Sequence, residues 1–295
     1  MKTRAFFCQL RSRRVFLLAS LASLALAFGC RHPHDADAPK GLRLVSLAPD
    51  MTETLFEIGA GSSVIAVSDY CDTPSEVLRL PRVGTSITPN YEAITRLRPS
   101  LIVSEANVSA RRRELEALGP TRLLPWLTLE EIASSVRELG RITHKREAAN
   151  ALAARLEKRL GVPAPPNGPR VLMILGGESP DSSDIWFVRD NSLHGAVLRA
   201  AGARNAIPEA IQGPPRLSHE RLLSLDPDAI MILSKPRNDG QQRATGFESF
   251  STLSAVQKGR VVRVETTEAF ANGPRILPLV ERVRSELTRL GLGGA

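Results

Sequence analysis

NYEAITRLRPSLI, at residues 90–102, and SHERLLSLDPDAI, at residues 218–230, follow one pattern. Each stretch has a helix-capping Asn or Ser, a glutamate, a proline that ends a short helix, and then an apolar strand. The two glutamates, Glu92 and Glu220, lie 128 positions apart (220 − 92). Because a repeated pattern indicates repeated structural units, the sequence predicts two similar lobes, each with a carboxylate at an equivalent place.

Short apolar segments alternate with helical segments on both sides of this repeat. Parallel sheets flanked by helices produce such an alternation, so the predicted fold class is α/β with two similar lobes. Strands are expected at 42–47, 64–67, 81–84, 101–104, 122–125, 171–175, 185–188, 229–234 and 261–264. Further helices are expected at 49–58, 110–118, 192–201 and 250–256, and a last one runs from Pro274 to Gly291.

A longer helical pattern separates the two halves. Residues 129–160 have apolar positions at helical spacing and no proline, with Gly140 and Thr143 as candidate breaks. An unbroken helix over 145–160 is about 25 Å long, enough to connect two lobes. We therefore expect an N-terminal lobe at 42–140, one long, rigid linking helix at 141–162, and a C-terminal lobe at 169–292.

The N-terminus has the features of an export signal. Five basic residues and no acidic ones precede an apolar segment at 15–28. The small residues before Cys30 resemble a bacterial lipobox, which predicts a lipoprotein-type signal peptide at 1–29, lipidation of Cys30 and a polar tether at 30–41. The alternative is a non-lipidated signal peptide that is cut nearby, which would leave a soluble periplasmic protein.

Charge and cysteine content exclude several classes of protein. Removal of residues 1–29 lowers the net charge from +8 to +3, and no basic run remains to bind nucleic acid. Of three cysteines, only Cys71 would remain beside the anchor, so no disulfide scaffold is expected. Cys71 is either a metal ligand or, as we favour, an inert buried thiol. The histidines after residue 41 also lack the spacing of a metal site: His144, His194 and His219.

Several motifs in order resemble one protein family. They are LVSLAPDMTE at 44–53, GAG at 59–61, SDYCDTP at 68–74, PRVG at 81–84, NYE at 90–92 and AGARN at 201–205. Together they are similar to the periplasmic substrate-binding proteins of ABC importers for cobalamin, ferric siderophores and haem, and residues 69–74 look most like the cobalamin type and related metal-chelate members. The resemblance implies two α/β lobes joined by one long helix, with the ligand in the cleft between them.

The resemblance also implies a role for the repeated glutamates. In this family such residues pair with arginines of the permease dimer, so Glu92 and Glu220 are the candidate docking groups. The alternative is structural, because a glutamate in the first turn of a helix favours the helix dipole by about 0.3–1 kcal/mol.

The candidate ligand residues are mostly aromatic, since apolar walls hold large planar ligands. They are Tyr70, Trp186, Phe270 and Trp126, each with packing in the core as the alternative. Arg275 would meet either an anionic group of the ligand or a carboxylate of the other lobe. Asp50 and Thr52 are expected to cap the first helix.

The predicted protein is a lipid-anchored, extracytoplasmic, monomeric receptor without enzymatic activity or a cofactor of its own. It would deliver a metal chelate, a cobalt corrinoid in the first place, to an ABC permease dimer with cytoplasmic ATPases. A ferric siderophore or haem is the alternative cargo. A sensor or surface binding protein without a transporter is an alternative of another class, and a metallocluster enzyme is disfavoured because too few cysteines remain. The single linking helix predicts that the lobes close only slightly around the ligand.

Overall fold

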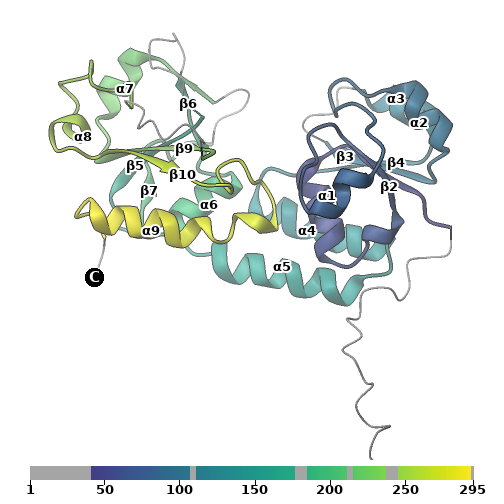
Figure 1. The fold of residues 1–295 in the computed structure, drawn as a ribbon. Coiled ribbons are helices and arrows are strands. Elements are labelled where there is room, and N and C mark those ends of the chain that lie inside the picture. The colour runs from purple at the N-terminus through teal and green to yellow at the C-terminus, as the bar shows by residue number, and fades with distance from the viewer. Residues whose placement is uncertain (1–40, 107–110, 177–184, 211–214, 237–244, 294–295) are drawn as a thin grey trace, which may run out of the picture. The chain divides into compact units, whose positions relative to one another are not determined.

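The computed structural model describes residues 41–106, 111–176, 185–210, 215–236 and 245–293 (Figure 1). The predicted signal peptide, Cys30 and nearly all of the predicted tether lie outside these residues. Within the described ranges, no helix is both long and apolar enough to cross a membrane.

The first lobe is built on a four-stranded parallel sheet. Its strands are β1 (Leu44–Ser46), β2 (Val64–Val67), β3 (Leu101–Glu105) and β4 (Thr121–Leu124), in the order β2-β1-β3-β4. Its helical segments are α1 (Pro49–Glu57), η1 (Gly61–Ser63), η2 (Ser75–Arg79), α2 (Tyr91–Leu97) and α3 (Arg112–Leu118).

The second lobe repeats this sheet. Its strands are β5 (Arg170–Leu175), β7 (Arg204–Asn205), β9 (Ala229–Ser234) and β10 (Val261–Glu265), and its order β7-β5-β9-β10 has the connectivity of the first sheet. Its helical segments are α6 (Leu193–Ala200), α7 (His219–Leu225), α8 (Ser254–Gln257), η3 (Pro274–Ile276) and α9 (Leu279–Arg289). A short antiparallel pair, β6 (Ile185–Trp186) and β8 (Arg216–Leu217), is added to it. The predicted class, two α/β lobes with parallel sheets flanked by helices, is confirmed.

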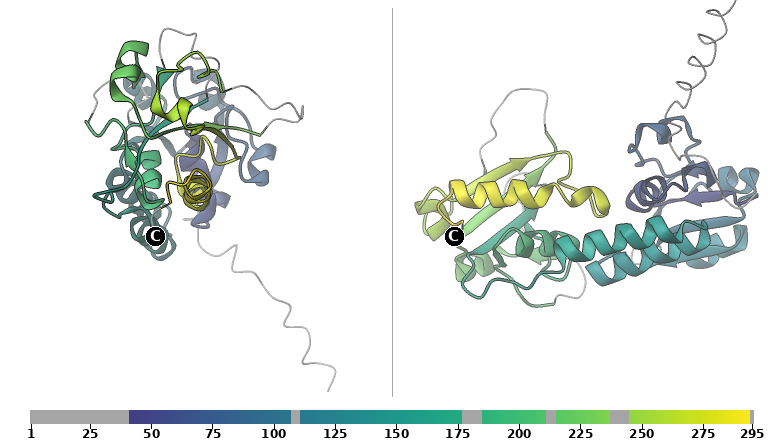
Figure 2. Two further views of the ribbon diagram at one scale, coloured as in Figure 1. Left: turned by 90° about the vertical axis from the view of Figure 1, so that its left-hand side faces the viewer. Right: turned by 90° about the horizontal axis from the view of Figure 1, so that it is seen from below.

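Two helices connect the sheets: α4 (Leu129–Ile142) and α5 (Arg146–Leu160), which lie side by side in Figures 1 and 2. The break between them is at His144, which has a φ of 59°. Gly140 is not the break but lies inside α4, where a Cβ would come within 2.2 Å of the Ala149 Cβ. Glycine is therefore needed because the two helices approach closely. The predicted linking segment 141–162 contains α5.

Both sheets alternate their side chains between two apolar layers. Leu44 and Val171 contribute to one large cluster that also includes residues of α4, α5 and α9, whereas Val45 and Leu172 belong to separate clusters on the opposite sheet faces. This period of two is what parallel sheets covered on both faces require.

Three predicted elements differ in the structure. Residues 81–84 form only isolated bridges, because Gly84 has a φ of 80° and turns the chain so that Gly84 pairs with Pro89. Residues 250–253 form turns, and α8 begins only at Ser254. The predicted last helix is divided, since Pro278 separates η3 from α9.

Candidate functional site

The two copies of the repeated stretch have the same local structure. The Asn90 side chain accepts a hydrogen bond from the Ala93 N–H at 3.0 Å, and the Ser218 side chain accepts one from the Arg221 N–H at 3.2 Å. Each helix has its glutamate at the second position, and each ends in a residue in the left-handed region, Arg98 with a φ of 46° and Asp226 with a φ of 38°. The capped helices predicted from the sequence are confirmed.

An arginine at the start of the first strand of each lobe, Arg43 directly before β1 and Arg170 as the first residue of β5, extends this equivalence. The Nη2 of Arg43 donates to the Leu97 carbonyl at 2.7 Å, and the Nη2 of Arg170 donates to the Leu225 carbonyl at 2.7 Å. The backbone N–H of each arginine also donates to the side chain that follows the proline stop, Ser100 and Asp228 respectively. The same arginine therefore fixes each glutamate helix against its sheet. This pair of arginines was not predicted, although each comes directly before a run of apolar residues in the sequence.

Glu92 and Glu220 are both exposed, but their surroundings differ. Glu92 forms an ion pair with Arg96, one turn further along α2. The Glu220 side chain has no hydrogen bond or ion pair with any residue that the structure describes. Both carboxylates are accessible from solvent, as a docking role requires.

Three of the four predicted ligand aromatics are accessible. Tyr70 is 73% exposed, Trp186 is 49% exposed and Phe270 is 45% exposed. The guanidinium of Arg216 lies 5.0 Å from the centre of the Trp186 ring, in a cation–π contact across the β6–β8 pair. Their exposure leaves the three rings accessible to a ligand.

Trp126 differs from the other three aromatics because only 1% of its surface is exposed. Its Nε1 donates to the Asn272 carbonyl at 2.7 Å, and the Asn272 Nδ2 donates to the Trp126 carbonyl at 3.3 Å. Its ring cannot line a ligand surface in this structure. The alternative stated for it, packing in the core, is the arrangement found.

The predicted capping role of Asp50 and Thr52 is wrong. The N-cap of α1 is Ala48, with Pro49 as the first helical residue, so both side chains lie inside the first turn. Thr52 donates its hydroxyl to Ser46 Oγ at 2.8 Å. The Asp50 carboxylate instead accepts a hydrogen bond from the Asn272 N–H at 2.8 Å.

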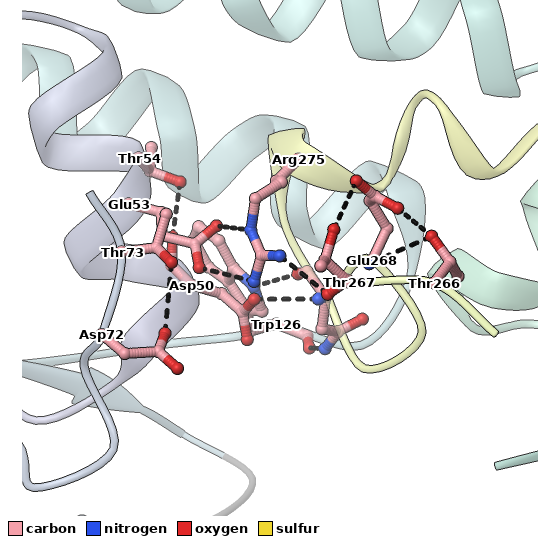
Figure 3. Close-up of polar contacts among 11 residues, drawn as sticks. Asp50, Glu53, Thr54, Asp72, Thr73, Trp126, Thr266, Thr267, Glu268 and Arg275 are labelled. Carbon is pink, nitrogen blue, oxygen red and sulfur yellow. Dashed lines mark hydrogen bonds and ion pairs between the residues drawn. The ribbon is translucent and has the colours of Figure 1, made fainter. Parts of the chain in front are cut away.

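Arg275 forms an ion pair with a carboxylate of the first lobe. Its Nε and Nη2 bind the two carboxylate oxygens of Glu53 at 2.9 Å and 3.0 Å, and its Nη1 donates to the Thr267 carbonyl at 2.9 Å (Figure 3). Glu53 is 8% exposed, so this is a largely buried, two-point pair. Of the two roles that the sequence left open for Arg275, the contact with a carboxylate of the other lobe is the one present.

These contacts define what we call the interlobe joint: Asp50, Glu53 and Trp126 on one side, Asn272 and Arg275 on the other. A close approach of the backbone accompanies them, because a Cβ on Gly273 would lie 3.3 Å from the Asp50 Cβ. The joint thus combines a two-point ion pair, a hydrogen bond to a carboxylate and a reciprocal Trp–Asn pair.

Burial changes the acidity of two carboxyl groups beside the joint. The pKa of Asp50 is raised to about 7, chiefly by desolvation and also by the nearby charge of Glu53, and the Asn272 N–H and Arg275 oppose this shift. Desolvation and the charge of Asp50 likewise raise the pKa of Glu105, at the end of β3, to about 7. One carboxyl group of the interlobe joint, Asp50, and one close to it, Glu105, therefore have pKa values near neutral pH.

Two further residues, Cys71 and His194, have buried side chains. Cys71 is buried, with its Sγ 3.3 Å from the Thr52 hydroxyl and 3.4 Å from the Ser68 hydroxyl. Burial lowers the pKa of His194 to about 4, and its Nε2 lies 3.0 Å from the Ala269 carbonyl, so a neutral ring donates there. Across the described residues, no group of three or more potential ligands is placed to hold a metal ion.

Comparisons with known proteins agree with this geometry. A vitamin B12-binding protein of Pectobacterium carotovorum is 27% identical over 261 residues, with 86% of this chain and 91% of that protein covered. One of Vibrio cholerae is 29% identical, with 82% and 87% covered. The crystal structure of the periplasmic vitamin B12-binding protein BtuF of Vibrio cholerae matches with a TM-score of 0.66 at 25% identity and covers 85% of this chain and 98% of that one.

A periplasmic haem-binding protein of Vibrio cholerae, HutB, has the same fold, with a TM-score of 0.68 at 19% identity over 83% of this chain and 98% of that one. The family model for periplasmic binding proteins matches residues 44–266, which include both sheets and the first-lobe side of the interlobe joint. The chain belongs to the periplasmic binding protein family.

Proposed function

We propose that this chain binds a corrinoid, cobalamin in the first place, outside the cytoplasm and delivers it to an ABC permease. The observation that carries this proposal is similarity over more than four-fifths of the chain to proteins named for vitamin B12 binding. The two-lobed fold supports it, since a bulky ligand is accommodated between two units more readily than on one surface.

The ligand surface that we propose consists of Tyr70, Trp186 and Phe270. Their exposed rings can cover the faces and edges of a large macrocycle, which buries apolar area at about 25 cal/mol per Å². Arg216, stacked on Trp186, adds a cation that suits a phosphate or a carboxylate on the ligand's periphery. In this proposal Trp126 and Arg275 act on the ligand only indirectly, through the interlobe joint.

Delivery depends on Glu92 and Glu220. They occupy equivalent positions on two similar lobes, so a dimeric permease with arginines on each half would meet one carboxylate from each lobe. We therefore expect the double variant Glu92→Gln/Glu220→Gln to retain its affinity for the ligand and to lose uptake in cells. A protein that serves as a sensor or surface binder without a transporter would show no such loss.

The rest of the proposal concerns location and chemistry. Residues 1–29 would direct export, and lipidation of Cys30 would hold the chain at the membrane as a monomer. The metal would arrive within the cargo, and the receptor would catalyse no reaction. Cys30→Ser tests the anchor: the variant should move from the detergent phase to the aqueous phase in a Triton X-114 partition, whereas a non-lipidated precursor would partition alike with and without the substitution.

Haem is the second candidate cargo because Tyr70 is so exposed. A phenolate oxygen can serve as an axial ligand of haem iron, whereas a corrinoid would need only the aromatic face. Tyr70→Phe separates the two cargoes: it should leave the affinity for cyanocobalamin within about twofold, but abolish a tyrosinate–iron absorption band if haem is bound through this residue.

Titration of the purified protein with cyanocobalamin, hemin and a ferric siderophore, followed by absorbance and calorimetry, tests the cargo. We expect cyanocobalamin to bind most tightly, and Trp186→Ala to weaken it by about tenfold, as the loss of one stacked ring implies. The matched control is Val162→Ala, which removes an exposed apolar side chain just after α5. A preference for hemin or for the siderophore would overturn the corrinoid assignment and leave the receptor role in place.

A further inference from the structure

The two copies of the repeat differ at the two positions that follow the glutamate by three and four residues. The α2 copy has Thr95 and Arg96, whereas the α7 copy has Leu223 and Ser224. Residues three and four positions apart share one face of a helix, so these side chains lie next to the glutamates. The sequence repeat therefore places two different surfaces around two equivalent carboxylates.

On α2 the glutamate already has a cation. The Arg96 guanidinium donates to the Glu92 carboxylate, and both side chains are about three-quarters exposed, at 75% and 76%. An exposed pair at this spacing, with the glutamate on the N-terminal side, is favourable but weak. A partner arginine must compete with Arg96 for Glu92, and it approaches a second positive charge as it does so.

On α7 the glutamate has no competing cation among the described residues. Arg221 is adjacent in sequence and so points away from Glu220 on the helix, and its guanidinium lies 3.9 Å from the Glu209 carboxylate. Leu223 is 46% exposed beside it and offers apolar area where α2 presents the Thr95 hydroxyl, which donates to the Tyr91 carbonyl. Within the part of the chain that the structure describes, the α7 surface combines a carboxylate that has no ion pair with an apolar neighbour, a combination that favours a stable contact.

We infer that docking is asymmetric: α7 supplies the dominant contact to a cationic partner surface, and Arg96 restrains Glu92 so that α2 contributes less. This inference rests on the proposed function, in which Glu92 and Glu220 meet the permease. It adds that the partner surface opposite α7 is both basic and apolar. It also adds that the residues at positions 96 and 224 determine how much each lobe contributes to the docking affinity.

Exchange of the residues at the equivalent positions 96 and 224 tests this inference. The probe is the permease–ATPase complex of the same transport system, held in lipid nanodiscs, and the readout is its dissociation constant by biolayer interferometry at low and high salt. Arg96→Ser should tighten binding by about two- to fivefold, and Ser224→Arg should weaken it by a similar factor. Glu220→Gln should weaken binding more than Glu92→Gln, and Leu223→Thr should weaken it without changing its salt dependence.

Two controls separate the possible results. Arg96→Ser should have no effect when Glu92→Gln is also present, because the restraint acts through that carboxylate. Circular dichroism and ligand affinity should stay unchanged in all variants, since these side chains are exposed. Equal losses from Glu92→Gln and Glu220→Gln, with no gain from Arg96→Ser, would overturn the asymmetry but keep the docking role. If neither glutamate variant weakens binding, the proposed docking function itself fails.

Discussion

The Asp50 side chain lies in the first turn of α1 and accepts a hydrogen bond from the Asn272 N–H of the other lobe. A carboxylate near the start of a helix suggests an N-cap, but an N-cap residue must come before the first helical residue. Because α1 already begins at Pro49, Asp50 lies inside the helix and cannot cap it. The carboxylate therefore enters the interlobe joint, where burial rather than the helix N-terminus dominates its pKa. Only the partner from the other lobe, Asn272, reveals this role, and no local pattern contains it.

The raised pKa values of Asp50 and Glu105 give stability a defined pH dependence. Both are raised in the folded state, from 3.8 and 4.5 to about 7, so the folded state loses stability as the pH rises from about 4 to 7. His194 acts in the opposite direction, because its lowered pKa costs stability as the pH falls from 6.5 to about 4. Each group contributes about 1.4 kcal/mol per pH unit within its window, so the carboxyl pair prevails and stability should decline toward neutral pH.

Asp50→Asn removes one of these titrations and keeps an oxygen that accepts the Asn272 N–H. We expect the variant to melt at a higher temperature than the parent at pH 8, by an amount equivalent to about 1–3 kcal/mol, and to match it near pH 4.5. Differential scanning calorimetry across this range measures the effect. Glu76→Gln, which changes an exposed carboxylate in η2, is the control. A difference that stays constant with pH would contradict the prediction.

At the scale of the element, the strands and the repeated helices could be predicted because their causes are local. Caps at Asn90 and Ser218, prolines after the helices and runs of apolar residues all lie within a few positions. Thr143, one of the two candidate breaks in the sequence, is the C-cap of α4, directly before His144. The sequence could not exclude the other candidate, Gly140, because its role depends on close contact with Ala149 of the next helix. Residues 81–84 likewise have a strand-like sequence but pair with too few neighbours to form one.

The helix ends of the repeat allow a matched pair of substitutions. Arg98 and Asp226 both hold left-handed backbone, which costs a residue with a side chain about 1–2 kcal/mol relative to the right-handed form. Asp226 alone also accepts two hydrogen bonds from Ser254, both at 2.7 Å. Glycine relieves the backbone cost at either position but removes those bonds only at Asp226.

Opposite effects are therefore expected from the same substitution at equivalent positions. Arg98→Gly should raise the free energy of unfolding by up to about 1 kcal/mol, because strain relief exceeds the entropy that glycine adds to the unfolded chain. Asp226→Gly should lower it by about 1 kcal/mol, because two hydrogen bonds are lost. Urea denaturation monitored by circular dichroism compares the two. Effects of the same sign would show that the Ser254 contacts add nothing.

At the scale of the whole molecule, the sequence predicted two lobes and two equivalent carboxylates but not how the lobes are held. The repeat says what each lobe contains, whereas the joint depends on residues more than a hundred positions apart, such as Glu53 and Arg275. For the same reason Trp126 was expected on a ligand surface, although its hydrogen bonds and burial place it in this joint. Long-range polar pairs leave no periodic signal in one sequence.

The joint bears on the expectation that the lobes close only slightly around the ligand. The Asn272 N–H bonded to Asp50, the Trp126–Asn272 pair and the Glu53–Arg275 pair would all have to break or shift in a large hinge motion. Arg159 of α5 also pairs with Glu281 of α9 at 3.0 Å, although this contact is exposed and weak. Spin labels at the exposed Arg113 of α3 and the exposed Gln257 of α8 should therefore show nearly the same distance distribution with and without cyanocobalamin, and a large shift would contradict a stiff joint.

The Glu53–Arg275 pair is the contact whose removal should loosen the joint most. Arg275→Met leaves Glu53, which is 8% exposed, as a buried carboxylate without its cation, so we expect a loss of about 2–4 kcal/mol and faster amide exchange over 266–273. Glu53→Met/Arg275→Met removes both charges and should recover much of the stability, because two apolar side chains of similar size replace an ion pair that had to be desolvated.

Amide exchange measured by mass spectrometry then separates stability from restraint. In the double variant the melting temperature should return toward that of the parent, while exchange over 266–273 stays fast, since the two-point pair that aligned this segment is absent. Ligand affinity should fall in both variants if the joint positions Phe270, which lies in the same segment and is 45% exposed. Unchanged affinity together with fast exchange would mean that the joint supports the fold alone and has no part in shaping the proposed ligand surface.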